Sequence, residues 1–329
     1  MNGSSTVLVT SRSFSSGELD LIAELRAAGL TVAFGDPEHE LRGLVPILAQ
    51  AVGWIAGAGP VTVAHLNAAP HLRIVARYGV GVEAVDLTAA AALGIVVTNS
   101  PGANTAAVAD HALALMLGAL RDLAVGDRRV RAGDWRVDRT RQLGNLVVGI
   151  IGVGRVGRAV AARLAGFGSR MLGYDPGVSP AELRRLGIEP VSLLELVRRS
   201  DIITLHRPGE ELLVDAAFLR QVSPGCILIN TARATLVDEA AVASALQSGT
   251  LRRYAADTLG SEVAARTSSP LLTESLADRT LFTPHSAAQT IEAVDRMGRS
   301  AVDAVLAVLR DEMPPNVVAA NGSPEQAMR

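Results

Sequence analysis

The 329-residue sequence has a single cysteine, Cys226. One cysteine excludes an intramolecular disulfide, and its place in the apolar run CILIN favours a small buried residue over a reactive thiol. Aromatic residues make up only 3% of the chain. The core must therefore consist mainly of Ala, Val, Leu and Ile, a composition that suits parallel strands covered by helices.

Long apolar runs and blocks of one charge are also missing. The longest apolar stretches, such as HALALMLGAL, are shorter than the roughly 18 residues that a membrane span needs. The formal net charge is −2 and no basic block occurs, so we expect no nucleic-acid partner. The N-terminus lacks the pattern of a signal peptide, so we expect a cytoplasmic protein. No His, Cys and carboxylate cluster has metal-ligand spacing, so we expect no metal.

What the chain does have is a repeated alternation of β-rich runs and helical patterns. Hydrophobic residues make up 49% and charged residues 19%, and the length fits about two domains. The first part is predicted to form strands at 6–10, 31–34, 52–57, 72–77 and 94–99, with helices at 17–29, 40–50, 61–68 and 86–93. A long helix is predicted at 100–123, then a second alternating series and a final helix at 287–310. This alternation indicates an α/β fold with parallel sheets.

The second series begins with a glycine fingerprint, IIGVGRVG, between a β-run and a helical run. Gly152 allows a tight turn, Gly154 lets the backbone approach a pyrophosphate, and Gly157 lets the helix pack closely on the strand. The start of the helix, at Arg155 and Val156, then presents N–H groups and a positive dipole end to the phosphates. The context indicates a dinucleotide site.

Asp175 ends the next β-run, 18 positions after Gly157 (175 − 157). An acidic residue at this place accepts hydrogen bonds from the adenosine ribose and repels a 2′-phosphate. Pro176 and Gly177 follow it, without an arginine that would bind such a phosphate. We therefore predict NAD, rather than NADP, as the cofactor.

Three polar residues follow the fingerprint: Arg233 in INTARAT, Glu262 in DTLGSE and His285 in FTPHSAA. An anion holder, a carboxylate and an imidazole are the groups that a nicotinamide enzyme needs to reduce a 2-keto acid. Each residue alone is more often a surface charge or a turn residue. Their order after a dinucleotide fingerprint favours a catalytic set.

This order and spacing resemble the D-2-hydroxyacid dehydrogenase family, phosphoglycerate dehydrogenase-like, in a short form without the C-terminal regulatory domain. NTARATLVDEAAVASAL, the run from RYGVGVEAVDL to HALALML, and TSRSFSS near the start carry the resemblance. It implies two doubly wound parallel-sheet domains, with a Rossmann NAD domain (101–286) inserted in a flavodoxin-like substrate domain (1–100 and 287–329). It also implies a homodimer, built largely through the helix at 104–122.

The resemblance implies a role for each site residue. Arg233 holds the substrate carboxylate and keto oxygen, His285 protonates that oxygen, and Glu262 orients and charges the imidazole. The backbone N–H groups of Val80 and Gly81 bind the substrate carboxylate from the other domain. Five further residues are expected to bind the cofactor: His206, Pro208, Thr231, Ala232 and Asp257.

The expected substrate is a small 2-keto or 2-hydroxy acid, and a second anionic group on it is a further hypothesis. Arg12 follows the first strand and Arg77 ends a later one. Ligands of open parallel sheets lie outside the carboxyl ends of the strands. Both arginines could therefore bind a phosphate or phosphonate, although two solvated surface arginines are an equally good interpretation.

Several positions depart from the family pattern. Ala234 stands where glycine is usual, and the segment after Pro208 is shortened. Two alternatives therefore stay open. RYAADT and LFTPHSA resemble parts of phosphite dehydrogenases, which act on phosphite or a phosphonate but carry a lysine where Val80 stands. Some relatives are NAD-sensing corepressors without enzymatic activity.

Overall fold

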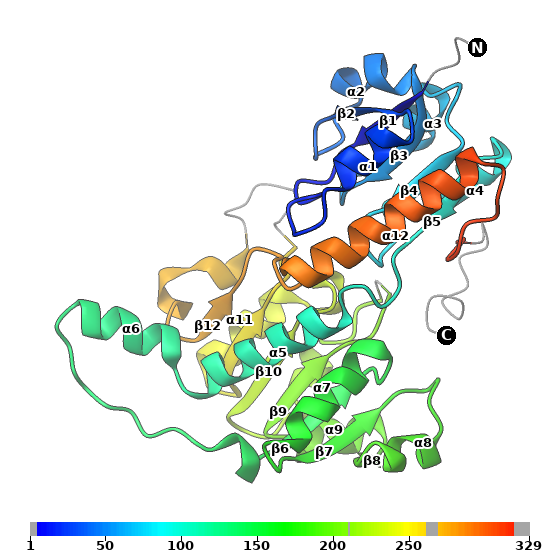
Figure 1. Cartoon of the computed structure of the whole chain (residues 1–329). Coiled ribbons are helices and arrows are strands. Elements are labelled where there is room, and N and C mark those ends of the chain that lie inside the picture. The colour runs from blue at the N-terminus through cyan, green and yellow to red at the C-terminus, as the bar shows by residue number, and fades with distance from the viewer. Residues whose placement is uncertain (1–4, 210, 261–268, 319–329) are drawn as a thin grey trace. The chain divides into compact units, whose positions relative to one another are not determined.

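The computed structural model describes residues 5–209, 211–260 and 269–318. The chain divides into two compact units. Unit 1 holds the chain up to Asn104 together with the chain from Ala288 onward, and unit 2 is Thr105–Ala287. Each unit is built around its own parallel sheet (Figure 1).

The sheet of unit 1 has five parallel strands in the order β2-β1-β3-β4-β5. The strands are β1 (Thr6–Val9), β2 (Thr31–Phe34), β3 (Ala51–Ala56), β4 (Ile74–Arg77) and β5 (Val96–Thr98). Alternate side chains point to opposite faces of a strand. Val7 and Val9 therefore pack under one layer of helices, and Leu8 packs under the other.

Helices cover both faces of this sheet. One face carries α1 (Leu21–Ala27) and α12 (Ile291–Leu309), and the other carries α2 (Leu41–Leu48), α3 (Val63–Asn67) and α4 (Leu87–Ala92). The long helix α12, orange in Figure 1, comes from the C-terminal part of the chain and lies along the strands of the N-terminal part. Unit 1 is therefore discontinuous in sequence.

The sheet of unit 2 has seven parallel strands in the order β12-β11-β10-β9-β6-β7-β8. The strands are β6 (Val147–Ile151), β7 (Arg170–Tyr174), β8 (Ile188–Pro190), β9 (Ile202–Leu205), β10 (Cys226–Asn230), β11 (Leu251–Ala256) and β12 (Thr280–Phe282). The order reverses between β6 and β9, as in doubly wound sheets. The prediction of an α/β fold with two doubly wound parallel sheets is confirmed.

Two helical layers also enclose the sheet of unit 2. One layer is α5 (Thr105–Leu120), α7 (Arg155–Ala165) and α8 (Pro180–Arg185), and the other is α9 (Leu193–Arg199), α10 (Ala216–Leu219) and α11 (Glu239–Ser248). Short 3-10 turns connect the layers to the strands: η1 (Leu143–Asn145), η2 (Ala234–Leu236), η3 (Pro270–Leu272) and η4 (Glu274–Leu276). None of the helices in the described part of the chain has both the length and the apolar character that crossing a bilayer requires.

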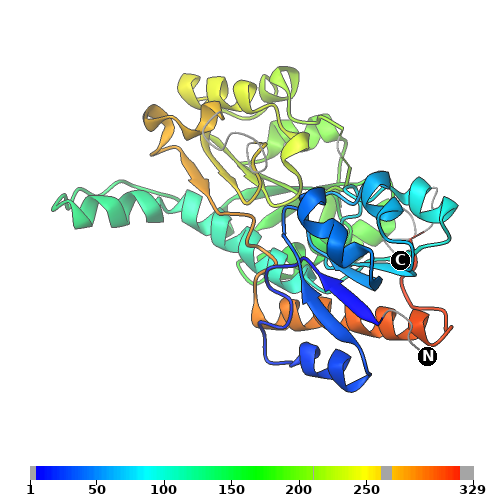
Figure 2. The same ribbon diagram turned by 90° about the horizontal axis from the view of Figure 1, so that it is seen from above.

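The helix predicted at 100–123 is shorter in the structure, and a second helix follows it. Asp122, with φ +54°, breaks the chain between α5 and α6 (Leu123–Arg131). Its carboxylate accepts hydrogen bonds from Arg252 Nη2 at 2.8 Å and from Arg253 Nε at 2.9 Å. These charge-assisted bonds hold the break against β11. Consequently α6 extends away from the rest of unit 2, as Figures 1 and 2 show from two directions.

Candidate functional site

The turn after β6 needs two of its glycines for steric reasons. Gly152 has φ +89°, and a Cβ on it would lie 2.5 Å from the backbone N of Arg207. A Cβ on Gly157 would lie 2.1 Å from the carbonyl oxygen of Gly152. Real Cβ atoms do not approach other atoms so closely, so β6, α7 and the segment after β9 meet here only because these side chains are missing.

This turn lies at the point where the strand order reverses. The N–H of His206, just after β9, donates to the carbonyl of Ile151 at the end of β6 at 2.7 Å. In doubly wound sheets the carboxyl ends of the strands at such a point form the ligand-binding crevice. Helix α7 begins here at Arg155 with Gly154 as its N-cap, and glycine has no side chain to cap the first-turn N–H groups. The N–H groups of Arg155 and Val156 thus belong to the first turn, where an anion is favoured.

Asp175 stands beside the glycine turn, just after β7. One carboxylate oxygen accepts from the N–H of Val153 at 2.7 Å, and the other accepts from the N–H of Gly177 at 2.8 Å. The side chain is only partly buried. Asp175 therefore shapes the turn and still has acceptor capacity for a ribose hydroxyl.

His206 and the exposed Pro208 follow β9 on the other side of the turn. The imidazole lies 2.9 Å from Thr204 Oγ1 through Nε2 and 3.5 Å from Thr231 Oγ1 through Nδ1. Burial lowers the pKa of His206 to about 3, so the ring is neutral at neutral pH. A neutral ring between two hydroxyls suits a wall of a binding site better than an acid.

The loop after β10 carries Arg233 on a main chain fixed by a buried amide. Asn230 is fully buried; its Oδ1 accepts from the N–H of Ala232 at 3.0 Å and its Nδ2 donates to the carbonyl of Arg233 at 2.9 Å. Arg233 Nη1 donates to the carbonyl of Ala232 at 3.0 Å. Ala234 begins the turn η2 and is not among the non-glycine residues with positive φ. Alanine therefore replaces the usual glycine without backbone strain.

His285 lies just after β12, is exposed, and has φ +52°. A left-handed conformation is costly for a residue with a side chain, so the neighbouring loop must stabilise it. Its N–H donates to the carbonyl of Thr283 at 3.0 Å. The following N–H groups, of Ser286 and Ala287, each donate to the carboxylate of Asp257 at 2.9 Å.

Asp257 is only 1% exposed and organises this loop. Besides the two N–H groups, it accepts from Thr283 Oγ1 at 2.5 Å. Nε2 of His111, on α5, lies 2.8 Å from Thr283 Oγ1 and 3.4 Å from Asp257 Oδ1. A buried carboxylate needs hydrogen-bond donors such as these. We call Asp257, Thr283 and His111 the loop-anchoring network.

Glu262 lies outside the described residues, so its predicted partnership with His285 stays a prediction. The described residues on either side of 261–268 both bond to Glu239 at the start of α11. Glu239 accepts from the N–H of Gly260 at 2.7 Å and from Ser269 Oγ at 2.6 Å.

In unit 1, Val80 and Gly81 lie in the loop after β4, next to a glycine with positive φ. Gly79 has φ +139°, and Asn99 Nδ2 donates to the carbonyl of Val80 at 2.8 Å. Within the described residues, no acceptor forms a hydrogen bond with the N–H of Val80 or of Gly81. Two adjacent N–H groups of this kind can receive an anion.

The two arginines of unit 1 have different surroundings. Arg77 is partly buried, and its Nη1 donates to the carbonyl of Tyr78 at 2.5 Å and to that of Ala56 at 3.4 Å. Arg12 is 68% exposed in its side chain and pairs with Glu38. Arg77 thus supports the chain next to Val80, whereas an anion that binds Arg12 must compete with a carboxylate.

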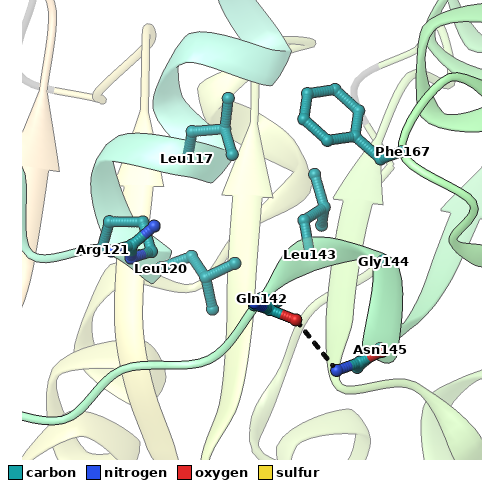
Figure 3. Close-up of a pocket in the computed structure, with 8 residues that line it drawn as sticks. All are labelled: Leu117, Leu120, Arg121, Gln142, Leu143, Gly144, Asn145 and Phe167. Atoms are coloured by element: carbon teal, nitrogen blue, oxygen red, sulfur yellow. Dashed lines mark hydrogen bonds between the residues drawn. The ribbon is translucent and has the colours of Figure 1, made fainter.

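A cavity of about 390 Å³ in unit 2 lies away from these residues. Leu117, Leu120, Leu143 and Phe167 line it, and its polar rim includes Gln142 and Asn145, which are joined by a hydrogen bond of 3.3 Å (Figure 3). Asn145 comes just before β6, at its amino end. The glycine turn follows the carboxyl end of the same strand, so the cavity is not part of the candidate site.

Within unit 2, those predicted residues that the structure describes lie at the carboxyl ends of β6, β7, β9, β10, β11 and β12, which share one edge of the sheet. Sequence reasoning did not predict the roles of Asn230, Thr283 and His111. The residue types carried a signal, because Asn230 ends an apolar strand and Thr283 directly precedes the Pro-His pair. The contacts themselves depend on how β10, β12 and α5 lie together.

Residues 113–287 match the family model described as D-isomer specific 2-hydroxyacid dehydrogenase, NAD binding domain. Over 263 residues the chain is 42% identical to a D-3-phosphoglycerate dehydrogenase of Mycobacterium leprae, an overlap of 78% of this chain and 49% of that protein. It is 37% identical over 268 residues to a glyoxylate reductase of Korarchaeum cryptofilum, with 79% and 80% covered. The chain thus spans about half the length of the phosphoglycerate dehydrogenase and most of the reductase.

Solved structures are similar over nearly the whole chain. The TT0316 protein of Thermus thermophilus has a TM-score of 0.85 and 33% identity, with 95% of this chain and 100% of that one covered. D-lactate dehydrogenase of Aquifex aeolicus, complexed with NAD and lactic acid, has a TM-score of 0.84 and 26% identity, with 95% and 98% covered.

Proposed function

The chain belongs to the D-isomer specific 2-hydroxyacid dehydrogenase family, whose NAD-binding domain it contains, and from this we propose that it is an NAD-dependent oxidoreductase. It would interconvert a small 2-keto acid and the D-2-hydroxy acid. The observation that carries the proposal is the gathering of the glycine turn, Arg233 and His285 at one edge of the unit 2 sheet.

The residues of unit 2 fit the cofactor that the family uses. Gly152 and Gly157 leave space where a Cβ would collide, and α7 presents the N–H groups of Arg155 and Val156 for a pyrophosphate. Asp175 would accept from the ribose hydroxyls. His206, Pro208, Thr231, Ala232 and Asp257 are the proposed contacts toward the nicotinamide end. Bound NADH supplies the hydride.

Arg233 and His285 would perform the remaining chemistry. The guanidinium fork of Arg233 holds the substrate carboxylate and keto oxygen, which fixes the carbon that receives the hydride. His285 donates a proton to the keto oxygen in reduction and accepts it in oxidation. Glu262 is proposed to keep the imidazole in one tautomer and to favour its charged form. Val80 and Gly81 in unit 1 are proposed to bind the carboxylate through their N–H groups.

A panel of 2-keto acids tests this function through the oxidation of NADH. The panel includes glyoxylate, hydroxypyruvate, 3-phosphohydroxypyruvate and phosphonopyruvate. We expect turnover of at least one acid, and a loss of about 10²–10⁴ in kcat in His285→Asn with NADH binding retained. Tight binding of NADH without turnover of any acid would instead favour an NAD sensor.

We further propose that the substrate carries a second anionic group, a phosphate or phosphonate. Arg12 and Arg77 both lie just after or at the end of a strand of the unit 1 sheet, at its carboxyl edge. Arg12→Ala should then reduce kcat/KM for the phosphorylated acid more than for glyoxylate. Glu38→Gln should raise kcat/KM for the phosphorylated acid, because it removes the carboxylate that pairs with Arg12. Equal losses for all acids in the Arg12 variant would remove the second anion from the proposal.

We also propose a homodimer, although through a different surface from the helix at 104–122. Most apolar side chains of α5, including Leu113, Met116 and Leu120, are buried in the core of unit 2 itself, so they are not available to a partner. Exposed apolar side chains occur instead on α6 and after it: Leu123, Val130, Trp135 and Val137. Light scattering at micromolar concentration should give twice the mass of 34.2 kDa. A mass of one chain would contradict the dimer.

A further inference from the structure

A cation bonds to the same residue of the glycine turn as Asp175, although no arginine or lysine stands directly after Asp175 at 176 or 177. Arg158, on the second turn of α7, donates through Nε to the carbonyl of Val153 at 3.0 Å. The N–H of the same residue, Val153, donates to Asp175 at 2.7 Å. The arginine and the aspartate therefore bond to the two polar atoms of one residue in the glycine turn.

A second carboxylate holds this arginine. Nη1 of Arg158 pairs with Oε1 of Glu182, on α8, at 2.7 Å. The side chains are 41% and 29% exposed, so both are partly open to solvent. Ser179 accepts from the N–H of Glu182 and caps α8 with its side chain, which fixes the backbone that carries the glutamate. The guanidinium is thus bonded on one side to the turn and on the other to Glu182.

These three side chains contribute to the charge around the glycine turn and the chain after β7, where the proposed ribose site lies. Asp175 and Glu182 contribute two negative charges and Arg158 one positive charge, so the net charge is negative. A ribose 2′-hydroxyl donates to a carboxylate, whereas a 2′-phosphate is repelled by it and needs an arginine. The arginine is present, but Glu182 already neutralises it.

We propose that Glu182 is a second determinant of cofactor choice, which excludes the 2′-phosphate of NADP by keeping Arg158 paired. The inference rests on the proposed use of NAD and extends it. Asp175 repels the phosphate directly. Glu182 acts through Arg158, because it neutralises a cation that the phosphate would otherwise use. Cofactor choice is therefore set by a triad, and the acid after β7 is only one member of it.

The test measures binding alone, by fluorescence titration of the wild-type protein and variants with NADH and NADPH. Asp175→Asn removes the direct repulsion and keeps an acceptor for the turn. In that background, Glu182→Gln should lower the Kd for NADPH by about fivefold, the upper end of what an exposed ion pair contributes. The Kd for NADH should change by less than about twofold.

Two further variants separate the triad from general charge effects. Adding Arg158→Gln to the double variant should abolish the gain in NADPH affinity, because the cation itself is lost. Glu189→Gln, which frees Arg170 and Arg199 elsewhere on unit 2, is the matched control and should leave the Kd for NADPH unchanged.

An unchanged NADPH Kd in the Asp175→Asn/Glu182→Gln variant would overturn the inference, and so would a gain that survives the loss of Arg158. Either result leaves the proposed function intact if the wild type binds NADH. A wild-type protein that binds neither nucleotide would remove both the proposed function and this inference.

Discussion

Arg233, the proposed holder of the substrate carboxylate, has a backbone that a buried amide fixes. The buried amide of Asn230 bonds to the main chain of both Ala232 and Arg233, so the loop after β10 holds one conformation before any substrate binds. Preorganisation of this kind reduces the ordering that binding requires. The planar fork of arginine also matches a carboxylate in a way that lysine does not.

Replacing Arg233 should therefore weaken the use of the substrate and leave the binding of the cofactor unchanged. Arg233→Ala should lower kcat/KM by a factor of tens to thousands, since losing a charge-assisted pair costs about 2–5 kcal/mol. Arg233→Lys should recover only part of this loss. Steady-state kinetics with NADH titrations distinguish the two effects, and Arg198→Ala, an exposed arginine bonded to Gln221, is the control. Parallel losses in NADH affinity and turnover would indicate a structural arginine.

At the scale of elements, the junction of β6 and α7 depends on close approach and not on glycine flexibility alone. Gly152 and Gly168 both have positive φ, +89° and +73°. Only Gly152 has a neighbour that a Cβ would strike, because nothing lies within 4 Å of the Cβ position at Gly168. Comparing substitutions at these two glycines therefore distinguishes the cost of a positive φ from the cost of a steric collision.

Gly152→Ala should abolish NADH binding, because the added Cβ displaces the segment that begins at His206. Gly168→Ala should keep NADH binding and lower the free energy of unfolding by about 1 kcal/mol, the torsional cost alone. Fluorescence titration and urea unfolding measure the two quantities. Similar NADH affinities in both variants would show that the turn can relax around a methyl group.

The loop that presents His285 is stabilised by α5 and β11 through the loop-anchoring network. Thr283→Val removes the hydroxyl that joins His111 to Asp257 and leaves the shape of the side chain. The free energy of unfolding should fall by about 1–3 kcal/mol, the cost of unsatisfied buried partners. Turnover should also fall, since the left-handed conformation of His285 is less well supported.

Thr273→Val is the matched control, because its hydroxyl bonds only exposed groups, Pro270 O and Ser275. It should change neither stability nor kcat. A Thr283 variant with full kcat and reduced stability would show that the network supports the fold without positioning His285.

At the scale of the whole molecule, the response of stability to pH depends on a histidine that unit 1 buries. In unit 1 the ring of His39 is 2% exposed and lies 5.0 Å from the ring of Trp54. Its Nδ1 bonds to the carbonyl of Pro60 at 3.0 Å, and within the described residues its Nε2 has no hydrogen-bond partner. Burial lowers the pKa of His39 to about 4.

This depressed pKa predicts that unit 1 loses stability in acid. Above pH of about 6.5 the histidine is neutral in both the folded and the unfolded chain. As the pH falls from about 6.5 to about 4, the unfolded chain binds the proton more strongly, so the free energy of unfolding decreases. Urea unfolding at pH 7 and pH 4.5 should show a smaller decrease for His39→Asn than for the wild type. The exposed His71→Gln should retain the wild-type decrease, and an equal decrease in all three proteins would contradict the assignment.

The sequence by itself determined the parallel α/β architecture, the glycine turn and the family. These features are local or periodic, because strand runs, helical spacing and the fingerprint each lie within one segment of chain. The family and its NAD-binding domain are confirmed by the match over residues 113–287. Arg233 and His285 could be selected from short motifs for the same reason.

Only the tertiary structure decided which side chains meet. His111 reaches Thr283 across 172 positions, and Glu182 and Arg158 meet only when α8 and α7 pack on one face of the sheet. Likewise, the family resemblance implies a subunit interface on the helix at 104–122, but the apolar residues of α5 pack against α7, β10 and β11 and are buried in unit 2. Contacts between distant segments depend on the order and register of the strands. The composition and residue spacing of a single segment do not specify that order.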